Sequence, residues 1–117
     1  MEIGKTIYVP ERKQWRDWLS KNHSSAPDIW LVQYKKKTRK PSIPYADAVE
    51  EALCFGWIDS IEKSIDEERY ALRFTPRRPR SNWSKSNEER IRRLFSEGKM
   101  TKAGLAAAAD ILGQGPG

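Results

Sequence analysis

The chain has 117 residues, a length that suits one domain and leaves no room for two of ordinary size. Five Trp, four Tyr and three Phe are too many large aromatic residues for a disordered chain, although 32% of the residues are charged. A single cysteine and a single histidine exclude an internal disulfide, a thiolate cluster and a multi-histidine metal site. We therefore expect a folded domain with no bound metal and no cofactor.

The sequence also lacks the apolar segments that direct proteins to membranes. No apolar run approaches the roughly 20 residues that a helix needs to cross a bilayer, so we expect no membrane insertion. The N-terminal segment has no apolar stretch of the kind found in signal peptides. These features predict a reduced, soluble protein of the cytoplasm.

The net charge of +6 is distributed unevenly along the chain. Residues 1–46 carry ten basic and four acidic side chains, whereas residues 47–68 carry one basic and eight acidic ones. Residues 69–102 are basic again, with eleven basic and three acidic side chains. Two interpretations stay open: these segments pair with one another inside the molecule, or they separate into patches that attract an anionic partner.

The first predicted helix covers residues 10–22, where the opening proline suits a first helical turn. Within it Trp15, Trp18 and Leu19 recur at helical spacing and form one apolar stripe. Residues 29–34 are apolar on both alternating faces at their start, which predicts a strand in the centre of a sheet.

A basic loop over residues 35–40 leads to a second predicted helix at residues 45–55. Gly56 is expected to end this helix as a left-handed cap. Strands are predicted at residues 57–64 and 69–75, where apolar and polar side chains alternate in the second strand. An acidic turn joins them, so we expect a hairpin.

Two more helices are predicted in the C-terminal part of the chain. Ser86 and Glu89 form a capping box, which predicts a helix that starts at Ser86 as N-cap and ends at residue 97. A last helix is expected over residues 101–112. Residues 1–9 are a candidate edge strand.

These elements predict an α+β domain with the order α-β-α-β-β-α-α. We expect a small, largely antiparallel sheet of three strands, or four with the edge strand, and helices packed on it. Residues 1–112 form this single domain, and residues 113–117 are expected to be a flexible end. The residues predicted to form the core are Trp15, Trp18, Leu19, Trp30, Val32, Val49, Leu53, Trp57, Ile58, Leu72, Phe74 and Leu94.

The arginine loop, residues 75–85, is the densest candidate site. Arginine binds phosphate or carboxylate in a bidentate manner, and tryptophan offers a flat face on which a base can stack. We expect an anionic ligand (a nucleotide, a nucleic acid or phosphate) at Arg77, Arg78, Arg80, Trp83 and Lys85. The alternative is structural: the arginines neutralise Asp59, Glu62 and Asp66, and Trp83 lies in the core.

Asp59 is the single candidate for catalysis, and a weak one. It shares a strand face with Trp57 and Ile61, so burial could raise its pKa and suit it to acid or base chemistry. The alternative is an ion pair with Arg73, Arg77 or Arg78.

Two further reactive side chains have simpler interpretations. Cys54 lies on the second predicted helix with no histidine nearby in the sequence, and we interpret it as a core residue. His23 follows a helix end, where it would interact with the helix dipole.

Several segments resemble the bacteriocin-protection, YdeI/OmpD-associated family of bacterial proteins. The resemblance extends from about Trp15 to Leu105, and its most distinctive parts are ALCFGWIDS (residues 52–60) and FTPRRPRSNWSK (residues 74–85). It implies a link to an outer-membrane porin and protection against bacteriocins or related stress. It implies no settled enzyme activity and no catalytic residues.

Together these features lead us to expect a cytoplasmic stress-protection protein that acts as a small binding module through its arginine loop. One alternative is an enzyme in which Asp59 does acid or base work beside the arginines. A second alternative is a protein-interaction module whose aromatic face meets a protein partner.

Overall fold

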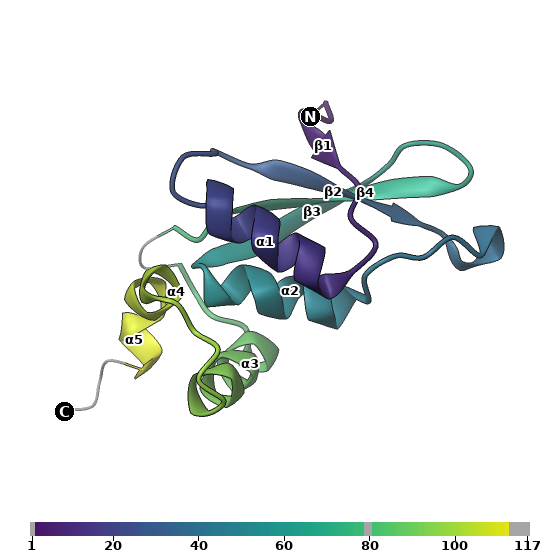
Figure 1. Cartoon of the computed structure of the whole chain (residues 1–117). Coiled ribbons are helices and arrows are strands. Elements are labelled where there is room, and N and C mark those ends of the chain that lie inside the picture. Colours follow the sequence, from purple (N-terminus) through teal and green to yellow (C-terminus); the bar gives the residue numbers. More distant parts are fainter. Residues whose placement is uncertain (1, 79–80, 113–117) are drawn as a thin grey trace.

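A computed structural model describes residues 2–78 and 81–112 of the chain (Figure 1). Its α+β architecture is the predicted one, with a four-stranded sheet in the order β1-β2-β4-β3. Strand β1 pairs with β2 in parallel, which confirms the edge strand, and the other neighbours are antiparallel. The strands are β1 (Thr6–Ile7), β2 (Ile29–Tyr34), β3 (Trp57–Ser64) and β4 (Arg69–Pro76).

The helices lie on one face and one end of this sheet. Helices α1 and α2 cover one face, and the three C-terminal helices gather at the end of the molecule away from the 3-10 turn η1 (Figure 1). The predicted last helix is divided in two at Ala108. The bounds are α1 (Arg12–Asn22), η1 (Lys36–Thr38), α2 (Tyr45–Cys54), α3 (Lys85–Ser96), α4 (Lys102–Ala107) and α5 (Ala109–Leu112).

The core lies between the sheet and helices α1 and α2. Ten of the twelve predicted core residues are buried, and Trp18 and Ile58 are half-buried. The indole of Trp15 is fully buried, packs 5.0 Å from the ring of Phe74, and donates a hydrogen bond of 2.9 Å to the carbonyl of Ala48. Each such apolar side chain contributes about 1.5–3 kcal/mol on burial.

Two predicted helix starts differ from the observed ones. The N-cap of α3 is Ser84, whose side chain accepts a hydrogen bond from the backbone of Asn87, so the capping box predicted at Ser86 is wrong. A serine two residues earlier offers the same oxygen, and the extended backbone there suits an N-cap. Helix α1 starts after Glu11 rather than at Pro10.

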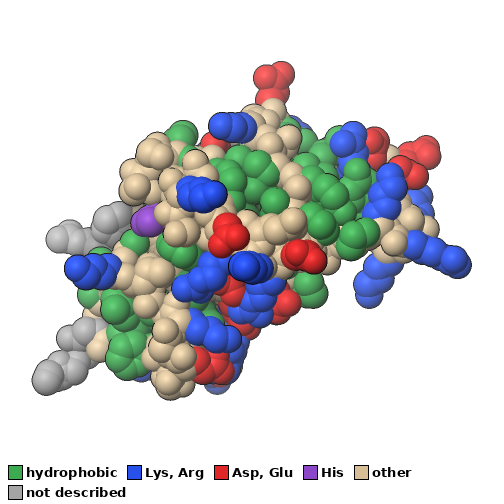
Figure 2. Space-filling model, viewed as in Figure 1, with side chains coloured by type: hydrophobic (Ala, Val, Ile, Leu, Met, Phe, Trp, Pro, Cys, Tyr) green, Lys and Arg blue, Asp and Glu red, His purple; other side chains and the backbone are tan. Residues whose placement is uncertain are grey.

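Ion pairs join the acidic side chains of α2 to basic side chains of α1 and α3. Arg12 pairs with Asp47, Glu50 and Glu51, and Arg93 of α3 also contacts Glu50. Figure 2 shows acidic and basic side chains intermingled over this part of the surface. Pairing within the molecule is therefore confirmed for this part of the acidic segment.

A close backbone approach docks the C-terminal helices on the end of α2. The carbonyl of Cys54 accepts hydrogen bonds from both the backbone and the hydroxyl group of Thr101. Gly104 lies so close that an added Cβ would be 2.2 Å from that carbonyl oxygen. No helix within residues 2–78 and 81–112 is long and apolar enough to span a membrane.

Candidate anion-binding site

Arg77 is a structural side chain and does not face a ligand. Its side chain is only 4% exposed and donates to the carbonyl of Ala107 at 3.0 Å and to the carbonyl of Ser81. Its ionic partner is Asp110 at 3.3 Å, which lies outside the acidic segment. Arg77 therefore ties the arginine loop to α4 and α5.

Trp83 belongs to the same assembly. Its indole nitrogen donates to both carboxylate oxygens of Asp110, at 3.2 and 3.0 Å, and its half-buried ring packs against the core. One face of the ring is covered by Arg77. A base therefore cannot stack on that face of Trp83, because Arg77 occupies it.

The remaining predicted residues of the loop are separated from one another. Lys85 is exposed as the first residue of α3 and does not line the cavity described below. Arg80 lies outside the described residues. Arg78 is the one described residue of the predicted set that lines this cavity.

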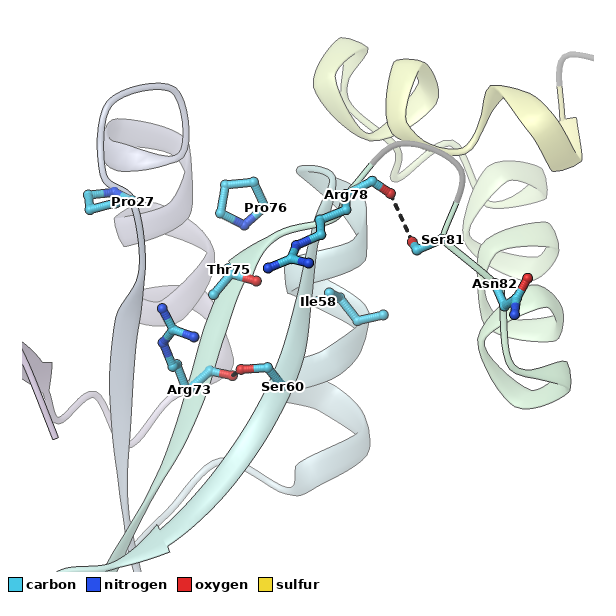
Figure 3. A pocket seen from close by; sticks show the side chains of 9 residues that line it. All are labelled: Pro27, Ile58, Ser60, Arg73, Thr75, Pro76, Arg78, Ser81 and Asn82. Atoms are coloured by element: carbon cyan, nitrogen blue, oxygen red, sulfur yellow. Dashed lines mark hydrogen bonds between the residues drawn. The ribbon is translucent and has the colours of Figure 1, made fainter. Parts of the chain in front are cut away.

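The cavity, which we call the arginine pocket, lies on the sheet face turned away from α1 and α2 (Figure 3). Leu72 and Phe74 of β4 are buried in the core beneath the helices, so the alternating Arg73 and Thr75 face the other side. The pocket has a volume of about 590 Å³. It is lined by Pro27, Ile58, Ser60, Arg73, Thr75, Pro76, Arg78, Ser81 and Asn82.

Two guanidinium groups dominate the pocket. Those of Arg73 and Arg78 lie on either side of Thr75 (Figure 3). Arg73 is oriented by a hydrogen bond of 2.9 Å from its Nε to the carboxylate of Asp28, and no hydrogen bond to a described residue occupies its Nη atoms. Arg78 is exposed and forms no ion pair with any described carboxylate.

Hydroxyl groups and the backbone shape the rest of the pocket. The Ser60 hydroxyl donates to the carbonyl of Arg73 at 3.4 Å, which links β3 to β4 beneath the cavity. The backbone and hydroxyl groups of Ser81 both donate to the carbonyl of Arg78, so these two residues lie side by side at the pocket. Asn82 adds an exposed amide.

Sequence reasoning missed Arg73 and Ser60 as ligand-binding residues, although Thr75 lies in the predicted arginine loop. The signal was present in β4, where Arg73 and Thr75 alternate with apolar residues and therefore face the side opposite the core. The sequence could not indicate that Ser60 lies beside them, because a register shift interrupts the pairing of β3 with β4 between Asp59 and Glu62.

Asp59 lies on the other side of the sheet from the arginine pocket. It is opposite Phe74 in the ladder and accepts a hydrogen bond of 2.6 Å from the hydroxyl of Tyr45. Burial and this contact raise the pKa of Tyr45 to about 12. The predicted ion pair is wrong, because Arg73 pairs with Asp28 and Arg77 with Asp110.

The other reactive side chains have structural surroundings. Cys54 is fully buried in the core cluster, and burial raises the pKa of its thiol, which confirms its interpretation as a core residue. The ring of His23 contacts the carbonyl of Leu19 at 2.8 Å where α1 ends, as expected. Among the residues that the structure describes, no group of His, Cys, Asp and Glu could hold a metal ion.

Comparison with known proteins gives one match. A family model described as a domain of unknown function, DUF8412, covers residues 7–107. No curated protein and no solved structure matches the chain. The matched residues include strands β2 to β4 and helices α1 to α4, which is most of the chain, and the chain therefore belongs to the DUF8412 family.

Proposed function

We propose that this domain is a binding module that captures an anionic group, phosphate or carboxylate, in the arginine pocket. The observation that carries the proposal is the convergence of Arg73 and Arg78 on one open cavity with hydroxyl and amide donors around it. Asp28 is the one described carboxylate paired with these two arginines, and it engages only the Nε atom of Arg73.

The chemistry of these side chains favours an oxyanion. A guanidinium group presents parallel N–H donors that match two oxygens of a phosphate or carboxylate. Arg73 stands on a strand and is oriented by Asp28, so little conformational freedom is lost when it binds a ligand. The cavity volume falls within the range of small-molecule sites.

Such a module would serve the cytoplasmic stress-protection role that the sequence resemblance suggests. An anion carried by a nucleotide, a nucleic acid or free phosphate would be captured rather than chemically changed. The alternative of an enzyme built on Asp59 gains no support from the geometry, because Asp59 and the two arginines of the pocket lie on opposite faces of the sheet.

The test is a titration of isotope-labelled protein with inorganic phosphate and pyrophosphate, followed by NMR at low and at physiological salt. We expect the backbone signals of Ser60, Thr75 and Ser81 to move, and the affinity to fall as salt rises. Arg78→Ala should weaken binding about tenfold, since an exposed charge-assisted contact is worth about 1–1.5 kcal/mol.

The matched control is Arg92→Ala, which removes an exposed arginine of α3 that does not line the pocket. It should leave the affinity unchanged. Equal losses in both variants would show a general effect of net charge, and the proposal would be wrong. Binding of phosphate that does not weaken as the salt concentration rises would also contradict the proposal.

A further inference from the structure

A second cavity of about 550 Å³ lies on the helix-covered face of the sheet, beside Tyr45 at the N-terminal end of α2. We call it the tyrosine pocket, because three tyrosines and three basic side chains contribute to its wall. Gln33 and Tyr70 are paired in the same ladder as the buried pair Leu31 and Leu72, so they face the helix side. The six side chains are Tyr34, Tyr45, Tyr70, Lys36, Arg39 and Lys40.

The ring of Tyr34 is held in place by contacts with Tyr8 and Lys40. The hydroxyl of Tyr8 donates a hydrogen bond of 2.6 Å to the carbonyl of Pro41, and its ring meets that of Tyr34 edge-on at 5.1 Å. The ammonium group of Lys40 lies 4.8 Å from the centre of the Tyr34 ring. Tyr45 is 49% exposed, so its ring is accessible to a ligand.

The positive charge of this pocket is not neutralised within the described part of the chain. No described carboxylate forms an ion pair with Lys36, Arg39 or Lys40, in contrast to the arginines of α1. Figure 2 shows Lys and Arg side chains projecting from the end of the molecule that carries η1. Arg39 has a left-handed backbone, with φ of 61°, which turns the chain back toward β2.

A buried acceptor in the wall has no partner. Gln33 is only 2% exposed, and its amide nitrogen donates to the carbonyl of Ile43. Its Oε1 atom has no hydrogen-bond partner among residues 2–78 and 81–112. Buried polar atoms are normally paired, so this oxygen can accept a hydrogen bond from a donor other than the described residues.

The two ends of the tyrosine pocket differ in charge. The hydroxyl of Tyr45 is bound to the carboxylate of Asp59, whereas Lys36, Arg39 and Lys40 come from the loop on the other side. A ligand with an anionic group, a flat ring and an N–H donor on that ring would match the basic side chains, the tyrosine rings and the unpaired Oε1 atom of Gln33, respectively. An acidic peptide without aromatic side chains would satisfy the basic residues and leave the tyrosine rings without a stacking partner.

We propose that the tyrosine pocket binds a nucleoside phosphate. The phosphate lies against Lys36, Arg39 and Lys40, the base stacks on tyrosine, and a ring amino group donates to Oε1 of Gln33. The nucleoside phosphate can be a free mononucleotide or one unit of a single-stranded nucleic acid. This inference is independent of the arginine pocket, which uses other residues on the opposite face of the sheet.

The test uses AMP, adenosine, inorganic phosphate and a short single-stranded oligo(dA), each titrated by calorimetry. We expect AMP to bind more tightly than adenosine or phosphate, because both the ring and the anion contribute. If AMP and oligo(dA) bind with similar affinity per site, the ligand is a free nucleotide. If oligo(dA) binds much more tightly, the source is a single strand.

Paired variants locate the site. Lys36→Glu combined with Arg39→Glu should weaken AMP binding at least about tenfold. Lys13→Glu combined with Lys21→Glu makes the same change of charge on exposed residues of α1 and should have little effect. Tyr45→Ala should weaken binding about tenfold, whereas Tyr45→Phe keeps the ring and should retain it.

Several results would overturn the inference. These are the absence of binding by both AMP and oligo(dA), equal binding of phosphate and AMP, and tighter binding of an acidic peptide than of AMP. Loss of AMP binding in Arg78→Ala with retention in the Lys36 and Arg39 double variant would also overturn it, by moving the ligand to the arginine pocket. All the replaced side chains are exposed, so circular dichroism should show intact folding in every variant.

Discussion

The guanidinium carbon of Arg77 lies 4.0 Å from the centre of the Trp83 ring, and both side chains are bonded to the carboxylate of Asp110. Neighbouring residues of one loop therefore have opposite roles. Arg77 holds the C-terminal helices to the sheet, and Arg78 faces the arginine pocket. Arg77 and Trp83 have structural contacts, and ligand binding stays a proposal for Arg78.

Arg77→Ala should lower the free energy of unfolding by about 2–4 kcal/mol, because the change removes a buried side chain and leaves part-buried carbonyl groups without their donor. Arg78→Ala should change it by less than about 0.5 kcal/mol, since that side chain is exposed. Urea denaturation of both variants checks this. Equal stability of the two variants would contradict the structural role of Arg77.

Gly104→Ala should destabilise the protein by about 2 kcal/mol or more, because its Cβ would be 2.2 Å from the carbonyl oxygen of Cys54. Helix α4 would have to move away from α2. Gly4→Ala is the matched control, since a Cβ there meets Trp30 at an ordinary contact distance of 3.7 Å. Thermal unfolding of both variants gives the comparison, and a stable Gly104→Ala protein would show that the docking of α4 is adjustable.

Cys54 should react very slowly with a thiol reagent at neutral pH. The side chain is fully buried, and burial raises the pKa of the thiol, so the reactive thiolate is scarce in the folded protein. The labelling rate should rise to that of a free cysteine in concentrated urea. Fast labelling of the folded protein would instead indicate an activated thiolate and support an enzymatic function.

Glu50 should make the stability of the folded protein sensitive to acid. Burial alone would raise the pKa of this carboxyl, but hydrogen bonds and charges from Arg12 and Arg93 outweigh it and hold the pKa below the ordinary value of 4.5. The folded state thus favours the carboxylate more than the unfolded chain does. This stabilisation is complete above pH 4.5 and is lost as the pH falls through the lower pKa of the folded state.

Glu50→Gln should therefore make stability less sensitive to acid. The free energy of unfolding, measured by urea denaturation, should fall less steeply between neutral and acidic pH than it does in the wild-type protein. The control is Glu67→Gln, which changes an exposed carboxyl of the hairpin turn. An identical acid dependence of the Glu50→Gln and wild-type proteins would show that the pairs with Arg12 and Arg93 contribute nothing to stability.

Local patterns in the sequence were enough to predict the elements and their order. The apolar stripe of Trp15 and Leu19, the strand at Ile29–Tyr34 and the left-handed turn at Gly56 all depend on neighbours within a few residues. The N-cap of α3 was misplaced because Ser84 and Ser86 both offer a suitable oxygen. Only the course of the chain before the helix selects Ser84.

The sites depend on tertiary structure. Strand alternation indicates that Arg73 and Thr75 face away from the core, but only sheet pairing brings Ser60 beside them, and only the tertiary structure places Arg78 and Ser81 at the same pocket. The sequence determined which residues could form helices, strands and a core, because those properties are local. The tertiary structure decided which arginines are structural and which line a cavity, because their partners come from distant segments whose contacts no local pattern encodes.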